Sequence, residues 1–160
     1  MQLRLARVEE YAAVGELTVA AYARFTLGPD DPYLDRLRDT ASRAAQAELW
    51  VAADGDRLLG TVTSCPPGSP WHELASDHEG EFRMLAVHPD ARGRGVGTAL
   101  ARLCEERARA HGATAMVLSS LGEMTEAHRV YEALGYEREP ERDWSPGRGV
   151  QLIAYAKELT

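Results

Sequence analysis

Cysteine is scarce in this sequence, and the two that are present, Cys65 and Cys104, form neither a CxxC motif nor closely spaced pairs. Disulfide-rich secreted domains depend on such pairs. We therefore expect two free thiols in a reducing compartment, by default the cytoplasm. No stretch approaches the roughly 20 apolar residues of a membrane-spanning helix, and the first residues lack the apolar segment of a signal peptide. The sequence thus predicts no membrane partner.

Positive charge is also limited. The 18 Lys and Arg residues face 25 Asp and Glu residues, which gives a net charge of −7, and Lys157 is the only lysine. This acidic balance disfavours a nucleic-acid partner and is compatible with a small amine-bearing substrate. A chain of 160 residues suits one domain. We expect that domain to span residues 1–160.

A metal site is not predicted either. The segment after Cys65 is rich in Pro and Gly and carries His72, Glu73, Asp77 and His78. These residues match no compact ligand spacing of the kind that holds zinc. We interpret the segment as a mobile loop and expect no metal.

The stretch from Glu81 to Leu103 carries most of the chemical information. It reads as a strand, a basic loop and a helix, and the loop has glycines at three alternate positions, Gly93, Gly95 and Gly97. A glycine loop that leads into a helix N-terminus points backbone N–H groups and the helix dipole at one place, which favours a phosphate group. Arg92 and Arg94 supply positive charge, so we predict an anion-binding loop.

The glycine spacing separates this loop from two common phosphate loops. The dinucleotide fingerprint needs G-x-G-x-x-G, whereas the glycines here follow G-x-G-x-G. A P-loop needs Gly-Lys-Ser/Thr, and no lysine is near. The remaining alternative from the residues alone is a glycine-rich turn with solvated arginines.

The motif Arg92-Gly93-Arg94-Gly95-Val96-Gly97, preceded by Leu85-Ala86-Val87, resembles the coenzyme A signature of the GNAT superfamily of N-acetyltransferases. A second stretch, Ala127 to Tyr136, is similar to that family's A-x-x-x-Y-x-x-x-G-F/Y pattern. The specific motifs cover only residues 81–98 and 127–136. Over the rest of the chain the resemblance is one of element order.

Hydrophobic periodicity supplies that order. Alternating apolar residues predict strands and 3.6-residue spacing predicts helices, with Gly, Pro and Asp-Gly-Asp as breaks. The expected strands lie at 3–8, 49–53, 58–65, 81–87, 113–119, from 136, and 150–157. The expected helices lie at about 14–25, 32–45, 98–110 and 125–134. Together with the resemblance this predicts an α+β GNAT-like domain: a mixed, mostly antiparallel, seven-stranded sheet flanked by about four helices.

The resemblance implies acetyl-CoA as co-substrate and assigns residues to it. The backbone from Arg94 to Thr98 would hold the pyrophosphate, with Arg92 adding charge, and the fourth strand would pair with the pantetheine arm where the fourth and fifth strands separate. Asparagine, which several relatives have after the fifth strand, is missing between Ser119 and Ala127. The implied cofactor residues are Leu85, Ala86, Val87, Arg92, Gly93, Arg94, Gly95, Val96, Gly97, Thr98, Ser119 and Ala127.

Two catalytic residues are implied in the same way. Tyr131 matches the family's general-acid tyrosine, which would protonate the departing thiolate; the alternative is a core tyrosine. Glu81, six residues before Val87, matches the glutamate that some members use as a base, directly or through water. A solvated glutamate is the alternative there, and Glu79 is the other carboxylate. His128 lies off the apolar face of its helix, so we interpret it as a surface or cofactor-flanking residue.

The acceptor is the least determined part. Aromatic residues in the expected acceptor segments can pack against an apolar or cationic group, or belong to ordinary packing. We favour a small or amino-acid-like amine over a protein lysine. A non-catalytic acyl-CoA-binding or sensor module, a longer acyl group and a homodimer all remain open. The candidate acceptor contacts are Phe25, Trp71 and Trp144, with Tyr22 and Tyr33 in the same segments.

Overall fold

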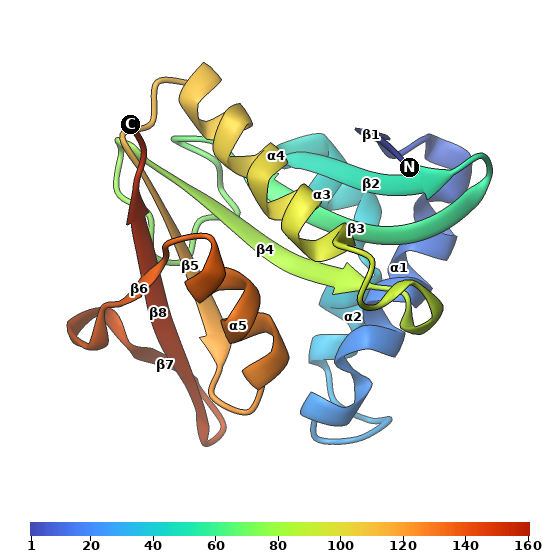
Figure 1. Cartoon of the computed structure of the whole chain (residues 1–160). Helices are drawn as coiled ribbons and strands as arrows, with labels where there is room; N and C mark the ends of the chain where they lie inside the picture. Colours follow the sequence, from blue (N-terminus) through green and yellow to red (C-terminus); the bar gives the residue numbers. More distant parts are fainter.

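The computed structural model describes all 160 residues and has one eight-stranded sheet at its centre (Figure 1). The sheet order is β1-β2-β3-β4-β5-β8-β6, and β7 pairs with β8. Only β4 and β5 run parallel. The strands are β1 (Gln2–Leu5), β2 (Glu48–Asp54), β3 (Arg57–Cys65), β4 (Glu79–Val87), β5 (Ala115–Leu121), β6 (Glu137–Arg138), β7 (Trp144–Gly147) and β8 (Val150–Glu158).

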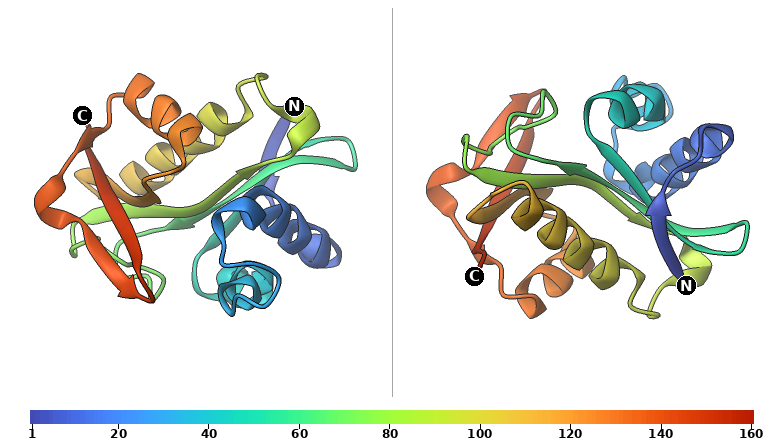
Figure 2. Two further views of the ribbon diagram at one scale, coloured as in Figure 1. Left: turned by 90° about the horizontal axis from the view of Figure 1, so that it is seen from below. Right: turned by 90° about the horizontal axis from the view of Figure 1, so that it is seen from above.

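Helices cover both faces of this sheet (Figure 2). On one face lie α1 (Tyr11–Tyr22), α2 (Tyr33–Arg38) and α3 (Thr40–Gln46), and on the other lie α4 (Val96–Ala110) and α5 (Thr125–Ala133). This arrangement confirms the predicted α+β class and its mixed, mostly antiparallel sheet. None of the helices combines the length and apolar character needed to cross a bilayer.

The α4 helix shows how the sequence pattern produces the core. Its residues Leu100, Cys104 and Ala108 recur at helical spacing and are almost fully buried against the sheet. Gly112 follows the helix in a left-handed conformation with φ of 84°, which glycine adopts at little cost. The predicted core position of Cys104 is confirmed, and both cysteines are free. Burial raises the pKa of the Cys65 thiol to about 12, so it stays protonated at neutral pH.

Two parts of the fold differ from the sequence prediction. The single helix expected at 32–45 is two short helices, because Asp39 leaves the helical conformation and its side chain accepts a hydrogen bond from Ser42 N (3.2 Å) as the cap of α3. The expected loop before Val150 contains β7. That strand, in a polar segment with a proline, accounts for eight strands where seven were expected.

Strand β4 separates from β5 at the point that matters for function. The two strands pair only from Glu79 to Glu81 and then diverge toward their C-terminal ends (Figure 1). On its other side β4 carries a bulge: Ala86 pairs with Thr61 and Arg83 with Thr63, which leaves one extra residue on β4. Met84 in this bulge has φ of 55°. Bulges bend a strand and redirect its side chains, and here the bend opens the sheet.

Candidate active site

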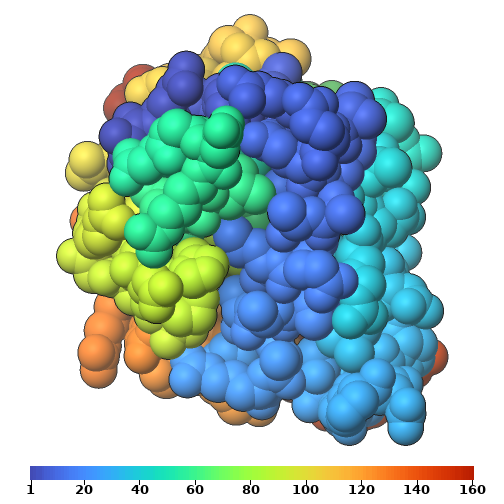
Figure 3. Space-filling model, turned by 90° about the vertical axis from the view of Figure 1, so that its right-hand side faces the viewer, coloured from blue at the N-terminus to red at the C-terminus, as the bar shows by residue number.

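A groove of about 950 Å³ runs beside the C-terminal end of β4. Three segments form it: the end of β4 with the loop that follows, the end of α1, and the start of α5. In Figure 3 the yellow-green loop after β4 lies against the blue end of the α1 region, with orange residues of the α5 region below. Among the predicted cofactor residues, those that line the groove are Leu85, Ala86, Val87, Arg92, Gly93, Gly95, Val96, Gly97, Thr98 and Ala127.

The loop backbone has the properties expected of an anion site. From Gly93 to Thr98, no backbone N–H donates a hydrogen bond to another protein group. Gly93 and Gly95 have φ of 76° and 77°, and a Cβ on either would meet no atom within 4 Å. Free N–H groups at the start of a 15-residue helix attract phosphate oxygens. Arg92, and Arg24 from beyond α1, add positive charge to the lining.

Two predicted cofactor residues lie elsewhere. Arg94 does not line the groove, and its guanidinium pairs with Asp54 at 3.2 Å. Ser119 lines a second cavity instead, where its hydroxyl accepts a hydrogen bond from Trp144 Nε1 (3.0 Å). In both cases a partner far away in the sequence sets the direction of the side chain.

The second cavity measures about 510 Å³ and lies between α2, the diverging strands and the β7–β8 hairpin. It carries charge from Asp31, Glu73 and three arginines. It meets the groove because the two share six lining residues. These are Tyr22, Phe25, Thr26, Leu85, Met124 and Tyr131. A donor bound in the groove and an acceptor bound in the cavity would therefore meet at the gap between β4 and β5.

Tyr131 lies at this junction. Its side chain is 6% exposed and packs against Phe82 and Tyr155, with ring centroids 5.9 and 5.8 Å away. The hydroxyl makes no hydrogen bond with the protein. Burial raises the pKa of the Tyr131 phenol, and neighbouring Tyr155 adds to the effect. The phenol is therefore protonated at neutral pH and able to donate to a ligand.

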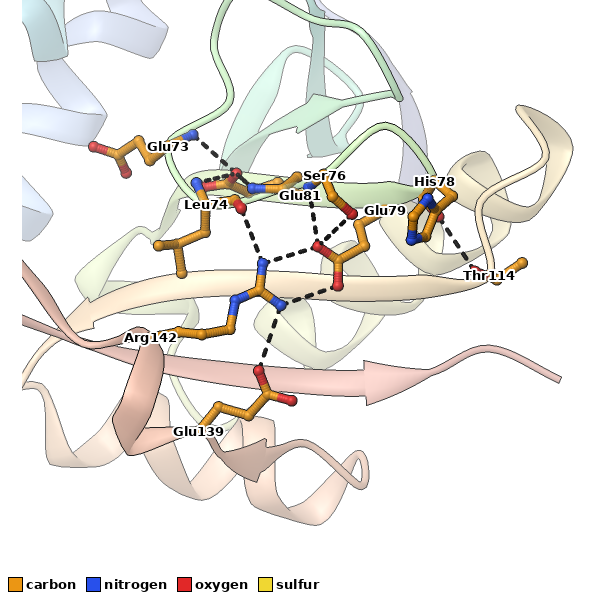
Figure 4. Close-up of polar contacts among 10 residues, drawn as sticks. Glu73, Leu74, Ser76, His78, Glu79, Glu81, Thr114, Glu139 and Arg142 are labelled. Atoms are coloured by element: carbon orange, nitrogen blue, oxygen red, sulfur yellow. Dashed lines mark hydrogen bonds and ion pairs between the residues drawn. The ribbon is translucent and has the colours of Figure 1, made fainter.

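Glu81 occupies a different environment from the one a base needs for direct contact. It is fully buried and lines neither cavity. Its Oε1 accepts hydrogen bonds from the backbone N–H groups of Glu73, Leu74 and Ala75 at 3.0–3.1 Å (Figure 4). Its Oε2 has no partner. The carboxylate thus anchors the loop between β3 and β4, and its role as base stays a prediction.

Glu79, the other carboxylate considered as a base, forms an ion pair with Arg142. Arg142 donates to both Glu79 oxygens (2.8 and 3.0 Å) and to the Leu74 carbonyl (2.9 Å), as Figure 4 shows. Neither Glu79 nor Arg142 lines a cavity. The same loop is therefore held from two sides.

The ion pair between Glu79 and Arg142 predicts that the stability of the fold falls at low pH. The hydrogen bonds from Arg142 lower the pKa of Glu79 from 4.5 to about 2, so the paired carboxylate stabilises the fold above pH 4.5 and this contribution is lost as pH falls toward 2. The thermal unfolding midpoint of wild type should fall between pH 6 and pH 2. The midpoint of Glu79→Gln should fall less over the same range. Equal declines in both proteins would contradict the assignment.

His128 is buried, so the surface position, one of the two placements predicted for it, is wrong; a place beside the cofactor stays a prediction. It is 9% exposed, and its Nε2 lies 3.0 Å from both Ser120 Oγ and the Leu121 carbonyl. Burial lowers the pKa of the imidazole. Helical spacing placed His128 off the apolar face of α5, but the end of β5 also lies against the side of the helix that carries His128.

The aromatic residues predicted for the acceptor have mixed outcomes. Phe25 lines both cavities, but Trp71 and Trp144 line neither. Trp71 is 7% exposed in a small core cluster and donates from Nε1 to Gln46 (2.9 Å). Sequence reasoning missed Glu73 as a lining residue, because nothing in its loop distinguishes it from the other acidic residues. No group of three or more His, Cys, Asp or Glu side chains is arranged for a metal ion.

These features define the class of protein: a sheet opened between β4 and β5, a phosphate-type loop after β4, and a tyrosine on α5 at the gap. The family model of the acetyltransferase (GNAT) family matches residues 12–136. The chain therefore belongs to the GNAT acetyltransferase family.

Two mycothiol acetyltransferases are among its relatives. The protein from Cellulomonas flavigena is 31% identical over 138 residues, which cover 76% of this chain and 40% of that protein. The protein from Geodermatophilus obscurus is 34% identical over 105 residues, which cover 64% of this chain and 33% of that protein. The chain thus spans two fifths or less of the length of these two relatives.

Solved structures agree on the fold. A ribosomal-protein-alanine N-acetyltransferase from Brucella melitensis superposes with a TM-score of 0.73 at 19% identity, covering 99% of this chain and all of that one. An aminoglycoside 6'-N-acetyltransferase complexed with coenzyme A gives 0.70 at 16% identity, covering 100% of this chain and 98% of that one.

Proposed function

We propose that residues 1–160 act as one domain that transfers an acetyl group from acetyl-CoA to a primary amine of a small substrate, by direct attack in a ternary complex. The observation that carries this proposal is the junction of the groove and the cavity at the β4 bulge. The groove offers free N–H groups to an anion, and the cavity offers two carboxylates and aromatic walls. Family membership supports the use of acetyl-CoA.

Each part of the chain has a task in this proposal. Acetyl-CoA, as co-substrate, supplies the acetyl group and leaves as a thiolate. The backbone from Gly93 to Thr98 and the Arg92 side chain hold its pyrophosphate, and the separated edge of β4 orients its arm. Tyr131 then provides a proton from its hydroxyl at the place where the two cavities meet.

The amine must lose a proton, and of the two carboxylates that line the cavity Glu73 is the candidate, because both Asp31 oxygens already accept backbone hydrogen bonds. Glu73 lines the cavity and pairs with Arg83 at 3.1 Å. Burial raises the pKa of Glu73 although Arg83 opposes the shift, so the residue is a stronger base than an exposed glutamate. We propose Glu73 for direct proton removal; Glu81 would need a water relay to the amine.

The two glutamates can be separated by matched variants. Glu73→Gln keeps the three backbone hydrogen bonds to Glu81. It should lower kcat/KM. In wild type kcat/KM should decline as pH falls through the raised pKa of Glu73, and the variant should not show this decline. Glu81→Gln replaces the charged acceptor of three backbone N–H groups with a neutral amide oxygen, so it should cost about 1–3 kcal/mol of stability and increase amide exchange at residues 73–75. A large loss of kcat in Glu81→Gln with unchanged exchange would assign the base to Glu81 instead.

The test of the overall function is release of free thiol from acetyl-CoA in the presence of a panel of amines, which includes the acceptor of the mycothiol acetyltransferases. Calorimetry with coenzyme A runs in parallel. Binding with turnover on an amine supports the transferase. Binding without turnover on any amine favours the alternative, a non-catalytic acyl-CoA sensor, and absence of binding contradicts the assignment of the loop.

A further inference from the structure

The second cavity, here called the acceptor cavity because the acceptor is proposed to bind in it, has more positive than negative side chains, whereas the chain as a whole is acidic. Five charged residues line it: Asp31, Arg36, Glu73, Arg83 and Arg148. Glu73 and Arg83 pair with each other, and the Asp31 carboxylate accepts hydrogen bonds from the backbone N–H groups of Leu27 and Tyr33 at 2.8 and 2.9 Å. Neither Arg36 nor Arg148 has a carboxylate within 4.0 Å. The cavity therefore has two arginines free to bind an anion, although the chain as a whole has a net charge of −7.

Arg148 occupies a backbone position that does not suit arginine. Gly147 pairs with Val150 across the β7–β8 hairpin, which leaves Arg148 and Gly149 as a two-residue loop. Both have positive φ, 59° and 73°, as in a type I′ turn, where Asn, Asp and Gly are preferred. A long side chain in this conformation costs roughly 1 kcal/mol. Such strain collects at functional positions, and Arg148 is one of the residues that line the cavity.

Arg36 is held in place by stacking on an aromatic ring. Its guanidinium lies over the Trp71 ring, 4.9 Å from the centroid, and Arg83 approaches the same ring at 5.4 Å. Trp71 is buried and fixed by its hydrogen bond to Gln46. A tryptophan face orients a cation and leaves its N–H edge free for another partner. The residue predicted as an acceptor contact thus positions two arginines.

We propose that the acceptor amine carries a carboxylate, which binds at the cavity mouth between Arg36 and Arg148 while its amine faces Glu73 and Tyr131. Arginine is suited to this task because its planar fork matches a carboxylate with two parallel hydrogen bonds. This inference rests on the proposed transferase function and adds the substrate class: amines of the amino-acid type.

The test uses matched triplets that differ only at the carboxylate: leucine, leucinamide and isoamylamine, with the corresponding sets for phenylalanine and methionine. For wild type, kcat/KM should be about tenfold or more higher for the free acid of at least one set. Calorimetry of the same compounds on the coenzyme A complex measures the anion site without turnover, so it stands even if no amine is acetylated.

Variants at the two arginines give the decisive comparison. Arg148→Asn suits the turn better, so its unfolding midpoint should rise while KM for the free acid rises about tenfold and coenzyme A affinity is unchanged. Arg36→Gln should also raise KM, whereas Arg38→Gln, on the same helix but paired with Glu16 outside the cavity, should not. A stabilised Arg148→Asn with unaltered KM and binding, or no preference for the acid in any triplet, would overturn the proposal.

Discussion

Tyr131→Phe should lower kcat by about a hundredfold and leave the affinity for acetyl-CoA nearly unchanged. Loss of a general acid commonly reduces turnover by about 10² to 10⁴, and the ring itself remains to fill its place between Phe82 and Tyr155. Because the hydroxyl makes no hydrogen bond with the protein, its removal should not destabilise the fold. Steady-state kinetics and calorimetry with coenzyme A measure the two quantities.

A second tyrosine serves as control. Tyr136 is also buried in the core, but its hydroxyl donates to Glu105 Oε2 (3.0 Å) and it lines neither cavity. Tyr136→Phe should therefore lose about 1 kcal/mol of stability and keep its turnover. If Tyr131→Phe retained full kcat, Tyr131 would be a packing residue and the thiolate would take its proton from elsewhere.

Gly60→Ala should have a large effect on stability. A Cβ on Gly60 would lie 2.8 Å from Val96 Cγ1 and 2.9 Å from the Ala86 carbonyl oxygen. The carbonyl belongs to the bulged strand and cannot rotate away, so β3 would push against both β4 and the start of α4. Overpacking of this kind costs about 1–3 kcal/mol. Since Val96 begins the helix whose N-terminus forms the anion loop, coenzyme A affinity should fall as well.

Gly122→Ala provides the comparison for that variant. Gly122 has no positive φ, and its added Cβ would meet no atom within 4 Å. Urea unfolding and coenzyme A titration should therefore give wild-type values for Gly122→Ala. A Gly60→Ala protein as stable as wild type would show that α4 does not pack on β3 as closely as described.

The strand, loop and helix at residues 81–110 could be predicted because their signals are local. Alternating apolar residues, three glycines and a helical stripe all lie within 30 residues, and each acts on its own neighbours. The same holds for the hairpin at Asp54-Gly55-Asp56, which joins β2 to β3 as predicted. The helix register that places Tyr131 on the inner face of α5 also follows from periodicity, and the structure buries it there.

Side chains whose positions depend on distant partners were the ones that sequence patterns did not place. His128 is buried because β5 ends under it, and the Arg94 side chain pairs with Asp54, 40 residues earlier. Trp71 is held by Gln46, 25 residues away. No local pattern reports such contacts, since each depends on how the sheet brings separate segments together.

The sequence by itself therefore determined the family, the order of elements and the loop that can hold a pyrophosphate. Only the tertiary structure decided which side chains line the acceptor cavity: Glu73 but not Glu81, and Arg36 and Arg148 beside the expected Tyr22, Phe25 and Tyr33. The physical reason is that a phosphate loop is made by consecutive backbone groups, whereas the acceptor cavity is made by side chains from α2, the β3–β4 loop and the β7–β8 hairpin, which meet only when the sheet has formed.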